Sequence, residues 1–330
     1  MSFGFRVRDF HDQPLSPEDR ATVAGLGIAE RKRMVDDLHV PLDGFQRAKE
    51  FIRSHHFPVT GAPHDVGKFH LLLGEWRSGK SWPVIHYEQE VNEARGSRDV
   101  HPVVHVTCGE GWGAKQVLIA IGTAITGNPV SERYGMRLLT SLVVNLLKQF
   151  KVELIVIDEL NEVMSKGKGQ QSSLLLSSLR AILDQRLCNV IGVGEPWIHK
   201  TVKTNHGYLG GRGGLLNHTV RSQDWHSTEG MENYMVFLNN VDARLPFSKP
   251  SGIGIPKYAA HFYDLSKGSI GYTMSYVAAA AFMALDAGAA KIEHEHLVAM
   301  GVEARGPKDG FTHFVDQLEP KLVGRRDAKK

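Results

Sequence analysis

Residues 71–82 read LLLGEWRSGKSW, and Gly74 to Ser81 within them follow the spacing G-x-x-x-x-G-K-[ST]. The two glycines let successive backbone N–H groups turn toward phosphate oxygens, and the first turn of a following helix adds a partial positive charge. Such a loop works only between a strand and a helix. The apolar run that ends at Gly74 predicts the strand, and residues 80–94 predict the helix, which tolerates Pro83 in its first turn. The stretch therefore predicts a phosphate-binding loop in an α/β fold.

The residues of this loop have separate predicted roles. The ammonium group of Lys80 would reach the β- and γ-phosphates of ATP, and the hydroxyl of Ser81 would hold Mg²⁺. An ordinary glycine-rich turn is the alternative, and the flanking strand and helix make it the weaker interpretation. The predicted nucleotide-binding residues are Gly74, Glu75, Trp76, Arg77, Ser78, Gly79, Lys80, Ser81 and Trp82.

A second motif, VELIVIDE at residues 152–159, carries two acidic residues. A continuous apolar run is expected for a central parallel strand, and the carboxyl end of such a strand points to the ligand-binding edge. Asp158 is predicted to order Mg²⁺, and Glu159 to polarise water for attack on the γ-phosphate, which favours hydrolysis over transfer to another substrate. The alternative is a surface acidic pair that closes the strand. The predicted catalytic residues are thus Glu159, Lys80 and Asp158, and the predicted metal ligands are Ser81 and Asp158.

The order of elements along the chain predicts the architecture. From about residue 68 to residue 194, short apolar runs alternate with helical patterns, as in a doubly wound parallel sheet. From Thr228 onward the pattern is helical. We therefore predict four parts: an N-terminal arm (1–30), a nucleotide-binding α/β domain (31–226), a small helical lid domain (227–304) and a C-terminal tail (305–330).

The composition is that of a soluble globular protein, with 42% hydrophobic and 23% charged residues among 330. No run approaches the roughly 18 apolar residues of a membrane span, and the N-terminus lacks the apolar core of a signal peptide. We therefore expect a cytoplasmic protein without membrane contact. Cys108 and Cys188 show neither disulfide nor zinc spacing, and His294 and His296 do not share a helix face. The net charge of +3 permits nucleic-acid binding without arguing for it.

The segment LIVIDELNEVMSKG…LLLSSLRAILDQRLCNVIGVG, residues 154–194, resembles the TniB/TnsC-type AAA+ ATPases of DNA transposons, which are relatives in role of the phage Mu B protein. In that family the acidic strand runs into residues of the type IDEhHN, and a Leu-rich helix leads to a strand of the type hVGVGT. The stretches VPLDGFQRAKEFI, HLLLGEWRSGKSW and GSIGYTMSYVAAAAFMALDAGAAKIEHEHL resemble further family segments. The resemblance implies a P-loop AAA+ fold, a doubly wound parallel sheet with a small C-terminal helical lid domain.

The resemblance also implies a function. Proteins of this family are ATP-dependent regulators that form rings or filaments around double-stranded DNA, mark a target site and recruit or activate the transposase. The implied cofactors are ATP and Mg²⁺. The implied partners are DNA, further copies of the chain, the transposase and a target-selection adaptor protein. Two alternatives remain open: a replication initiator or helicase loader with the same nucleotide core, and a DNA scaffold that binds nucleotide without hydrolysing it.

Two positions depart from the family pattern. Glu195 stands where a small hydroxyl residue usually follows GVG, and an acid there would repel the γ-phosphate unless it turned away. His218 stands where the family supplies an arginine finger in trans, and neutral imidazole stabilises transition-state charge less well than arginine. Arg212 or Arg221 could substitute, so both are predicted catalytic residues. We expect ATP binding with slow hydrolysis.

Contacts to DNA are predicted at three lysines. Lys115 follows the second strand, and Lys166 and Lys168 follow the acidic motif, in segments that we expect to be loops facing a central pore. Contacts of lysine with phosphate would be independent of base sequence and sensitive to salt. The alternative is that these are ordinary solvated lysines.

Overall fold

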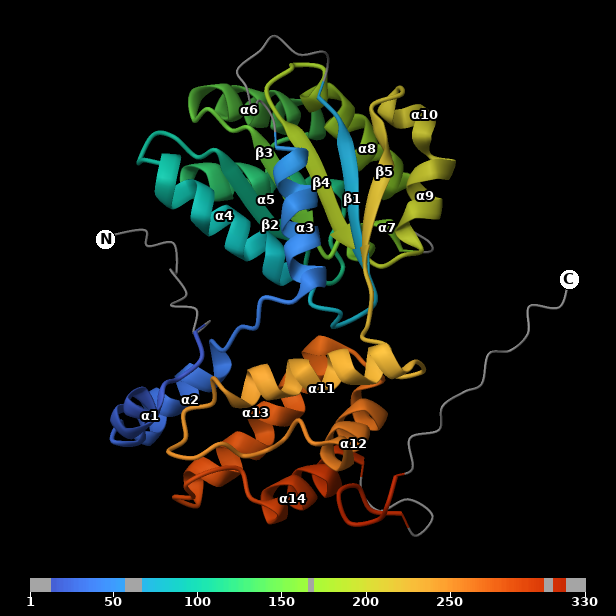
Figure 1. Cartoon of the computed structure of the whole chain (residues 1–330). Coiled ribbons are helices and arrows are strands. Elements are labelled where there is room, and N and C mark those ends of the chain that lie inside the picture. Colours follow the sequence, from blue (N-terminus) through green and yellow to red (C-terminus); the bar gives the residue numbers. More distant parts are fainter. Residues whose placement is uncertain (1–12, 57–66, 166–168, 306–310, 319–330) are drawn as a thin grey trace, which may run out of the picture. The chain divides into compact units, whose positions relative to one another are not determined.

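The computed structural model describes residues 13–56, 67–165, 169–305 and 311–318 (Figure 1). The chain divides into two compact units. Of the described residues, those between 43 and 221 form the first unit, and those of 13–42 and 222–318 form the second. Each unit has its own hydrophobic core.

The first unit is built on a sheet whose five strands all run parallel. The strands are β1 (Phe69–Gly74), β2 (Val103–Thr107), β3 (Leu154–Asp158), β4 (Asn189–Gly194) and β5 (Gly213–Val220). Their order across the sheet is β2-β3-β4-β1-β5, and all five carboxyl ends lie at one edge. The register places Leu73 beside Gly194, and Thr107 beside Asp158. The predicted doubly wound parallel sheet is confirmed.

Helices cover both faces of this sheet because side chains alternate along each strand. They are α3 (Asp43–Ser54), α4 (Ser81–Arg95), α5 (Ala114–Thr126), α6 (Met136–Gln149), α7 (Asn161–Met164), α8 (Gly169–Leu183), α9 (Ile198–Thr204) and α10 (His206–Leu209). In β1, Leu71 and Leu73 pack into the core formed with α5, α6 and α8, whereas Leu72 packs into the core formed with α3 and α4. In Figure 1, α3 and α4 lie over the front of the sheet. The sheet is thus the middle of three layers.

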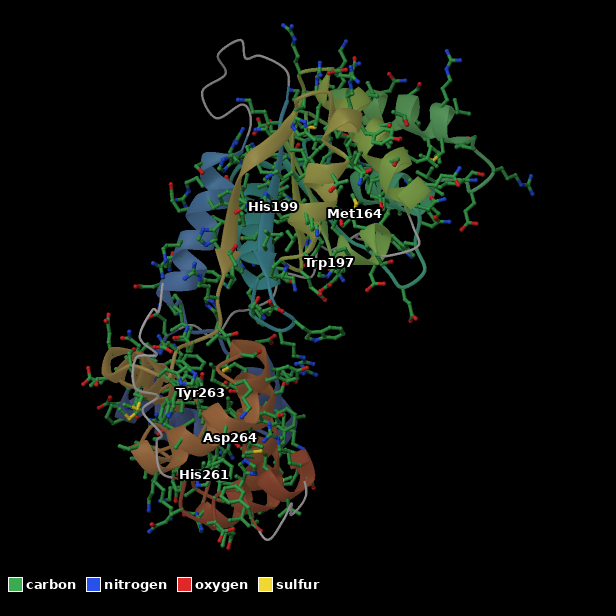
Figure 2. The ribbon with its side chains drawn as sticks, turned by 90° about the vertical axis from the view of Figure 1, so that its right-hand side faces the viewer. Met164, Trp197, His199, His261, Tyr263 and Asp264 are labelled. Atoms are coloured by element: carbon green, nitrogen blue, oxygen red, sulfur yellow. The ribbon has the colours of Figure 1, made fainter. Side chains whose placement is uncertain are left out.

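The second unit is helical. Its elements are α1 (Pro17–Ala24), α2 (Ile28–Asp36), α11 (Thr228–Asp242), α12 (Pro256–Ser266), α13 (Ile270–Asp286) and α14 (His294–Arg305). Serine side chains cap several of these helices: Ser16 caps α1, Ser227 caps α11 and Ser269 caps α13. Fully buried aromatic side chains from the described residues form the centre of its core, among them Tyr234, Phe237, Phe247 and Phe262. His261, Tyr263 and Asp264, which Figure 2 labels, lie on α12.

The described residues of the predicted N-terminal arm (1–30) contain α1 and the start of α2. Both helices belong to the second unit. The guanidinium group of Arg20 donates to the carbonyls of Asp242 (3.0 Å) and Phe247 (3.0 Å), and that of Arg31 donates to the carbonyl of Pro246 (2.8 Å). These buried arginines satisfy carbonyl groups at and beyond the end of α11. The sequence did not reveal the helices' place because the partners lie more than 200 residues away.

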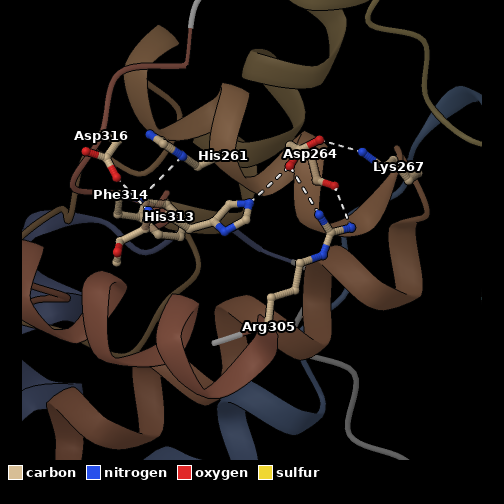
Figure 3. Close-up of polar contacts among 8 residues, drawn as sticks. His261, Asp264, Lys267, Arg305, His313, Phe314 and Asp316 are labelled. Atoms are coloured by element: carbon tan, nitrogen blue, oxygen red, sulfur yellow. Dashed lines mark hydrogen bonds and ion pairs between the residues drawn. The ribbon is translucent and has the colours of Figure 1, made fainter. Parts of the chain in front are cut away.

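Beyond α14, residues 311–318 are the described part of the predicted C-terminal tail (305–330). Residues 311–318 fold back against α12: Nε2 of His313 lies 3.0 Å from Oδ2 of Asp264, and Phe314 is fully buried (Figure 3). The N–H of Phe314 donates to Nδ1 of His261 at 3.2 Å. Burial lowers the pKa of His261 to about 4, so at neutral pH its ring is uncharged and can accept this bond.

In the described part of the chain, no single helix is long and apolar enough to cross a membrane. By length and composition, α12 and α13 pass as a candidate only together, and the pair is bent by 119°. Both helices contribute buried side chains to the core of the second unit.

Candidate nucleotide-binding site

The predicted phosphate loop leaves the carboxyl end of β1 and enters α4. Arg77 (φ 56°) and Gly79 (φ 89°) both have left-handed backbone conformations, which turn the chain sharply before the helix. A Cβ atom added to Gly74 would lie 2.3 Å from Oγ of Ser78, so only glycine fits there. This geometry belongs to a loop that points backbone N–H groups inward.

Side chains of the loop divide into two groups by exposure. Glu75, Trp76 and Arg77 are exposed, Trp76 to 66% of its surface, so the backbone of these three residues is what faces the loop's interior. Ser78 and Lys80 are buried, at 1% and 5% exposure. The Oγ atom of Ser78 is buried without a hydrogen-bond partner among the described residues. A buried hydroxyl left in this state costs free energy unless a ligand completes it.

Asp158 and Glu159 follow on β3, at the same edge of the sheet. Asp158 is 2% exposed, and the N–H of Glu159 donates to its Oδ1 at 2.8 Å. Burial by itself would raise the pKa of Asp158, but contacts with His105 and with the Ser81 hydroxyl outweigh burial and lower it. Asp158 is therefore a carboxylate at neutral pH, in contact with the serine hydroxyl that opens α4. Two hard oxygen ligands placed in this way fit Mg²⁺.

Glu159 has a left-handed backbone (φ 51°), and its Oε1 atom lies 3.9 Å from Nζ of Lys80. Such a conformation is costly for a residue with a Cβ atom, and this kind of strain is frequent at functional sites. The contact brings together the two charged groups that the sequence placed 79 positions apart. The structure thus joins all four predicted groups, Lys80, Ser81, Asp158 and Glu159, at one edge.

Sequence reasoning missed a fifth polar group near these four, His105 of β2. Its Nδ1 atom lies 3.3 Å from Oε2 of Glu88 on α4, and its Nε2 atom lies 3.8 Å from Oδ2 of Asp158. Burial lowers the pKa of His105, but the two carboxylates more than offset this effect and raise the pKa to about 9. A polar residue at the centre of the apolar run HPVVHVTC was the available signal.

Glu195 follows β4, next to the phosphate loop in the sheet. Its Oε2 atom accepts a hydrogen bond of 2.7 Å from the indole N–H of Trp197, a residue that Figure 2 labels. The acid that would repel a γ-phosphate is therefore turned to an indole donor. Beside it, Oδ1 of Asn161 is buried without a partner among the described residues and would lie 3.1 Å from a Cβ atom on Gly194.

The positions proposed for a trans arginine lie at opposite ends of β5. Arg212 precedes the strand and forms an ion pair with Asp184, so it lies at the amino edge, away from the phosphate loop. Arg221 follows the strand at the carboxyl edge and is exposed. His218 lies within the strand and stacks on Phe51 of α3, with ring centroids 5.7 Å apart.

Of the three lysines predicted to contact DNA, only Lys115 lies among the described residues. Lys115 lies in the first turn of α5 rather than in a loop, and its Nζ atom donates to the carbonyl oxygen of Glu132. The loop prediction for Lys115 was therefore wrong, because the helix begins directly after Gly113. Lys166 and Lys168 lie outside the described residues.

Comparison with known proteins gives a family and a fold. The family model of the bacterial TniB protein matches residues 44–208, which is half of the 330 residues. No curated protein sequence matches the chain.

The similar solved structures include three that illustrate the fold at low sequence identity. Aeropyrum pernix ORC2 in its ADPNP–ADP complexes is 13% identical, with a TM-score of 0.52 over 78% of this chain and 66% of that chain. A. pernix ORC1 in complex with DNA is 14% identical, with a TM-score of 0.51 over 79% of this chain and 64% of that one. Drosophila ORC bound to DNA is 14% identical, with a TM-score of 0.52 over 92% and 70%. The chain spans about two thirds of the length of these proteins. The likeness confirms the predicted P-loop AAA+ fold.

Proposed function

The chain belongs to the family of bacterial TniB proteins, and from this premise we propose that it is an AAA+ ATPase that assembles on double-stranded DNA, marks a transposition target site and recruits or activates the transposase. The observation that carries the proposal is the meeting of Lys80, Ser81, Asp158 and Glu159 at the carboxyl edge of the sheet. Two separate segments, residues 80–81 and residues 158–159, must fold together to place these groups. The buried, unpartnered Ser78 hydroxyl among them supports a polar ligand.

In the proposed reaction, the triphosphate of ATP lies in the loop of residues 74–81, and Lys80 contacts its β- and γ-phosphates. Phosphate oxygens compete with Glu159 for the Lys80 ammonium, which lies 3.9 Å from Glu159 before ATP arrives. Glu159 is then available to accept a proton from the water that attacks the γ-phosphorus. Ser81 and Asp158 would hold Mg²⁺, which supplies charge neutralisation at the transferred phosphoryl group.

Binding to DNA is the second part of the proposal. Two of the similar structures are complexes with DNA, and the family resemblance points in the same direction. Lys115, near the carboxyl edge, is the described residue that we propose for contact with phosphates of the duplex. Its ammonium group is engaged with Glu132, so DNA would have to displace that carbonyl contact. We propose further copies of the chain, the transposase and a target-selection adaptor protein as the other partners.

A nucleotide-dependent scaffold that does not hydrolyse ATP is the second candidate. It is favoured by His218, because burial and the nearby Arg47 lower the pKa of this imidazole and leave it uncharged. An uncharged ring stabilises a developing phosphate charge poorly. A replication initiator or helicase loader has the same nucleotide core, and the likeness to ORC proteins concerns the fold alone.

Steady-state ATPase activity measured with and without duplex DNA separates these candidates. The proposal predicts turnover above that of Lys80→Ala, increased by DNA, and DNA-bound oligomers in the presence of a non-hydrolysable ATP analogue. Turnover equal to that of Lys80→Ala, under conditions in which nucleotide binds, would leave the scaffold. A wild-type protein that remains monomeric by light scattering with analogue and DNA would contradict the transposition function.

A further inference from the structure

Three side chains, one buried and two largely shielded from solvent, form a row at the candidate magnesium site. His105 lies between Glu88 and Asp158, and its ring nitrogens face one carboxylate each, at 3.3 Å and 3.8 Å. The exposed fractions of the His105, Glu88 and Asp158 side chains are 12%, 19% and 4%. The proposed hydrolysis uses Asp158 but gives no role to the other two. The proposed hydrolysis does not explain why Glu88 and His105 are shielded from solvent beside Asp158.

Both ends of this row of side chains lie on or contact one helix, α4. Ser81 and Glu88 are seven residues apart in α4, about two helical turns, so they lie on the same face of the helix. Ser81 contacts Asp158 from the first turn, and Glu88 contacts His105 two turns later. Asp158 of β3 and His105 of β2 connect the two contacts from the sheet side. The four side chains therefore link the helix that begins at the phosphate loop with the two strands beside it.

The two contacts of His105 differ in kind. The approach to Glu88 is within reach of a hydrogen bond, whereas 3.8 Å to Asp158 is too long for one. Glu88 therefore fixes the orientation of the ring, and the ring lies against the Asp158 carboxylate and restricts its position. No hydrogen bond from His105 therefore occupies the lone pairs of Oδ2 of Asp158.

We propose that His105 and Glu88 are positioning residues for Mg²⁺, which orient Asp158 from behind and thereby set the affinity of the nucleotide complex for the metal ion. This inference rests on the proposed nucleotide site. Residues that orient metal ligands in this way typically contribute 10- to 100-fold to metal affinity. A purely structural ion pair is the competing explanation, because removing one partner of a buried pair also destabilises a fold.

The test is a titration of Mg²⁺ against the full chain in complex with a fluorescent ATP analogue, compared with binding of the same analogue in EDTA. For His105→Gln we expect the Mg²⁺ concentration at half-saturation to rise about tenfold, while affinity for the analogue in EDTA stays unchanged. Glu88→Gln should shift it in the same direction. The increase in the half-saturating Mg²⁺ concentration should be no larger in the double variant than in His105→Gln, because Glu88 acts on Asp158 through His105. His101→Gln, at a histidine just before β2 that packs against Phe150, is the matched control and should behave as the wild type.

The outcomes separate the inference from the function on which it rests. A wild-type chain that binds no analogue in either condition contradicts the nucleotide site itself. If the wild type binds and responds to Mg²⁺ but both variants follow its Mg²⁺ curve, the positioning role is wrong. Equal losses of affinity in EDTA and in Mg²⁺, together with a lower Tm, would establish the structural explanation instead. Should His105→Gln fail to fold, Glu88→Gln decides by the same criteria.

Discussion

The two edges of the parallel sheet contain similar residue types, but the contacts of these residues differ. At the amino edge, polar side chains are paired with one another: Glu153 lies 2.9 Å from His56 and 2.6 Å from Arg95. There, Asn189 accepts from the backbone N–H of Lys68 at 2.7 Å and donates to the carbonyl of His55 at 2.9 Å. These contacts connect the strand starts to the surrounding helices and loops. They stabilise the fold and leave these groups little capacity for a ligand.

The carboxyl edge carries the predicted nucleotide-binding groups. There, Oγ of Ser78 and Oδ1 of Asn161 are buried without partners among the described residues. A buried polar atom in this state costs free energy in the folded protein. The comparison shows that a parallel sheet separates the two tasks by strand direction, with stabilising pairs where strands begin and binding groups where they end. Charged residues at the two ends of a single strand can therefore be compared directly.

The largest expected difference in ATP hydrolysis is between variants at the two ends of β3, Glu159 and Glu153. Glu159→Gln should lower ATP hydrolysis by about 10²- to 10⁴-fold, because an amide cannot accept the proton of the attacking water. Nucleotide binding should persist. Glu153→Gln, at the amino end, should leave turnover within about twofold of the wild type. Phosphate release under saturating ATP measures both, and equal losses in the two variants would remove the catalytic role of Glu159.

The two ends of β1 provide the next comparison. Lys80→Ala should weaken ATP binding roughly 100-fold, since the variant loses charge-assisted contacts to two phosphates. Lys68, at the amino end, contributes its backbone N–H and has an exposed side chain, so Lys68→Ala should bind as the wild type. Isothermal titration calorimetry gives both affinities. A Lys80→Ala chain with wild-type affinity and an unchanged Tm would place the nucleotide elsewhere.

The third comparison is between Arg221 and Arg212, which lie at the two ends of β5. Arg221→Ala should lower DNA-stimulated hydrolysis about tenfold at protein concentrations that favour assembly, without a change in nucleotide affinity, as expected for a residue that acts on a neighbouring subunit. Arg212→Ala should leave hydrolysis intact and lower the Tm, because it releases Asp184. The reverse result would assign the trans role to Arg212.

A smaller effect is expected at Glu195, on the carboxyl side of β4. Glu195→Gln should raise hydrolysis about threefold, because it removes a negative charge near the γ-phosphate while an amide oxygen can still accept from the Trp197 indole. Trp197→Phe should have the opposite effect, since it frees the carboxylate to turn toward the phosphates. Multiple-turnover rates at saturating ATP test both. Slower hydrolysis by Glu195→Gln would show that the carboxylate assists the reaction.

The smallest effect concerns stability at the amino edge. Burial by itself raises the pKa of Glu153, but His56 and Arg95 outweigh burial and lower the pKa. The contribution of Glu153 is therefore complete above its ordinary pKa of 4.5 and is lost as the pH falls through the lowered value. At pH 7, Glu153→Gln should reduce the Tm by about 2–4 °C for each kcal/mol of unfolding free energy that the variant loses. The difference in Tm between wild type and variant should shrink below about pH 4.5. Thermal unfolding of wild type and variant from pH 7 to pH 4 checks this, and a constant difference contradicts it.

Local patterns were sufficient to predict the fold class and to pick out four side chains of the candidate site that lie together in the structure. The spacing from Gly74 to Ser81 and the acidic pair Asp158–Glu159 depend on backbone geometry within a few residues, and parallel strands bring their carboxyl ends to one edge. The apolar runs around both motifs predicted the strands that the structure contains. The functional groups that were predicted from such short stretches, Lys80, Ser81, Asp158 and Glu159, are the ones that the structure brings together.

Tertiary structure alone decided the rest, because it depends on which distant segments meet. The link from Glu88 through His105 to Asp158 joins a helix and two strands, and no spacing in the sequence encodes it. The helices α1 and α2 belong to the second unit through buried arginines that bond to carbonyls more than 200 residues away. Periodicity and motif spacing report on the local backbone, whereas the partner of a buried charge is determined only when the folded chain has removed water and left one group within reach.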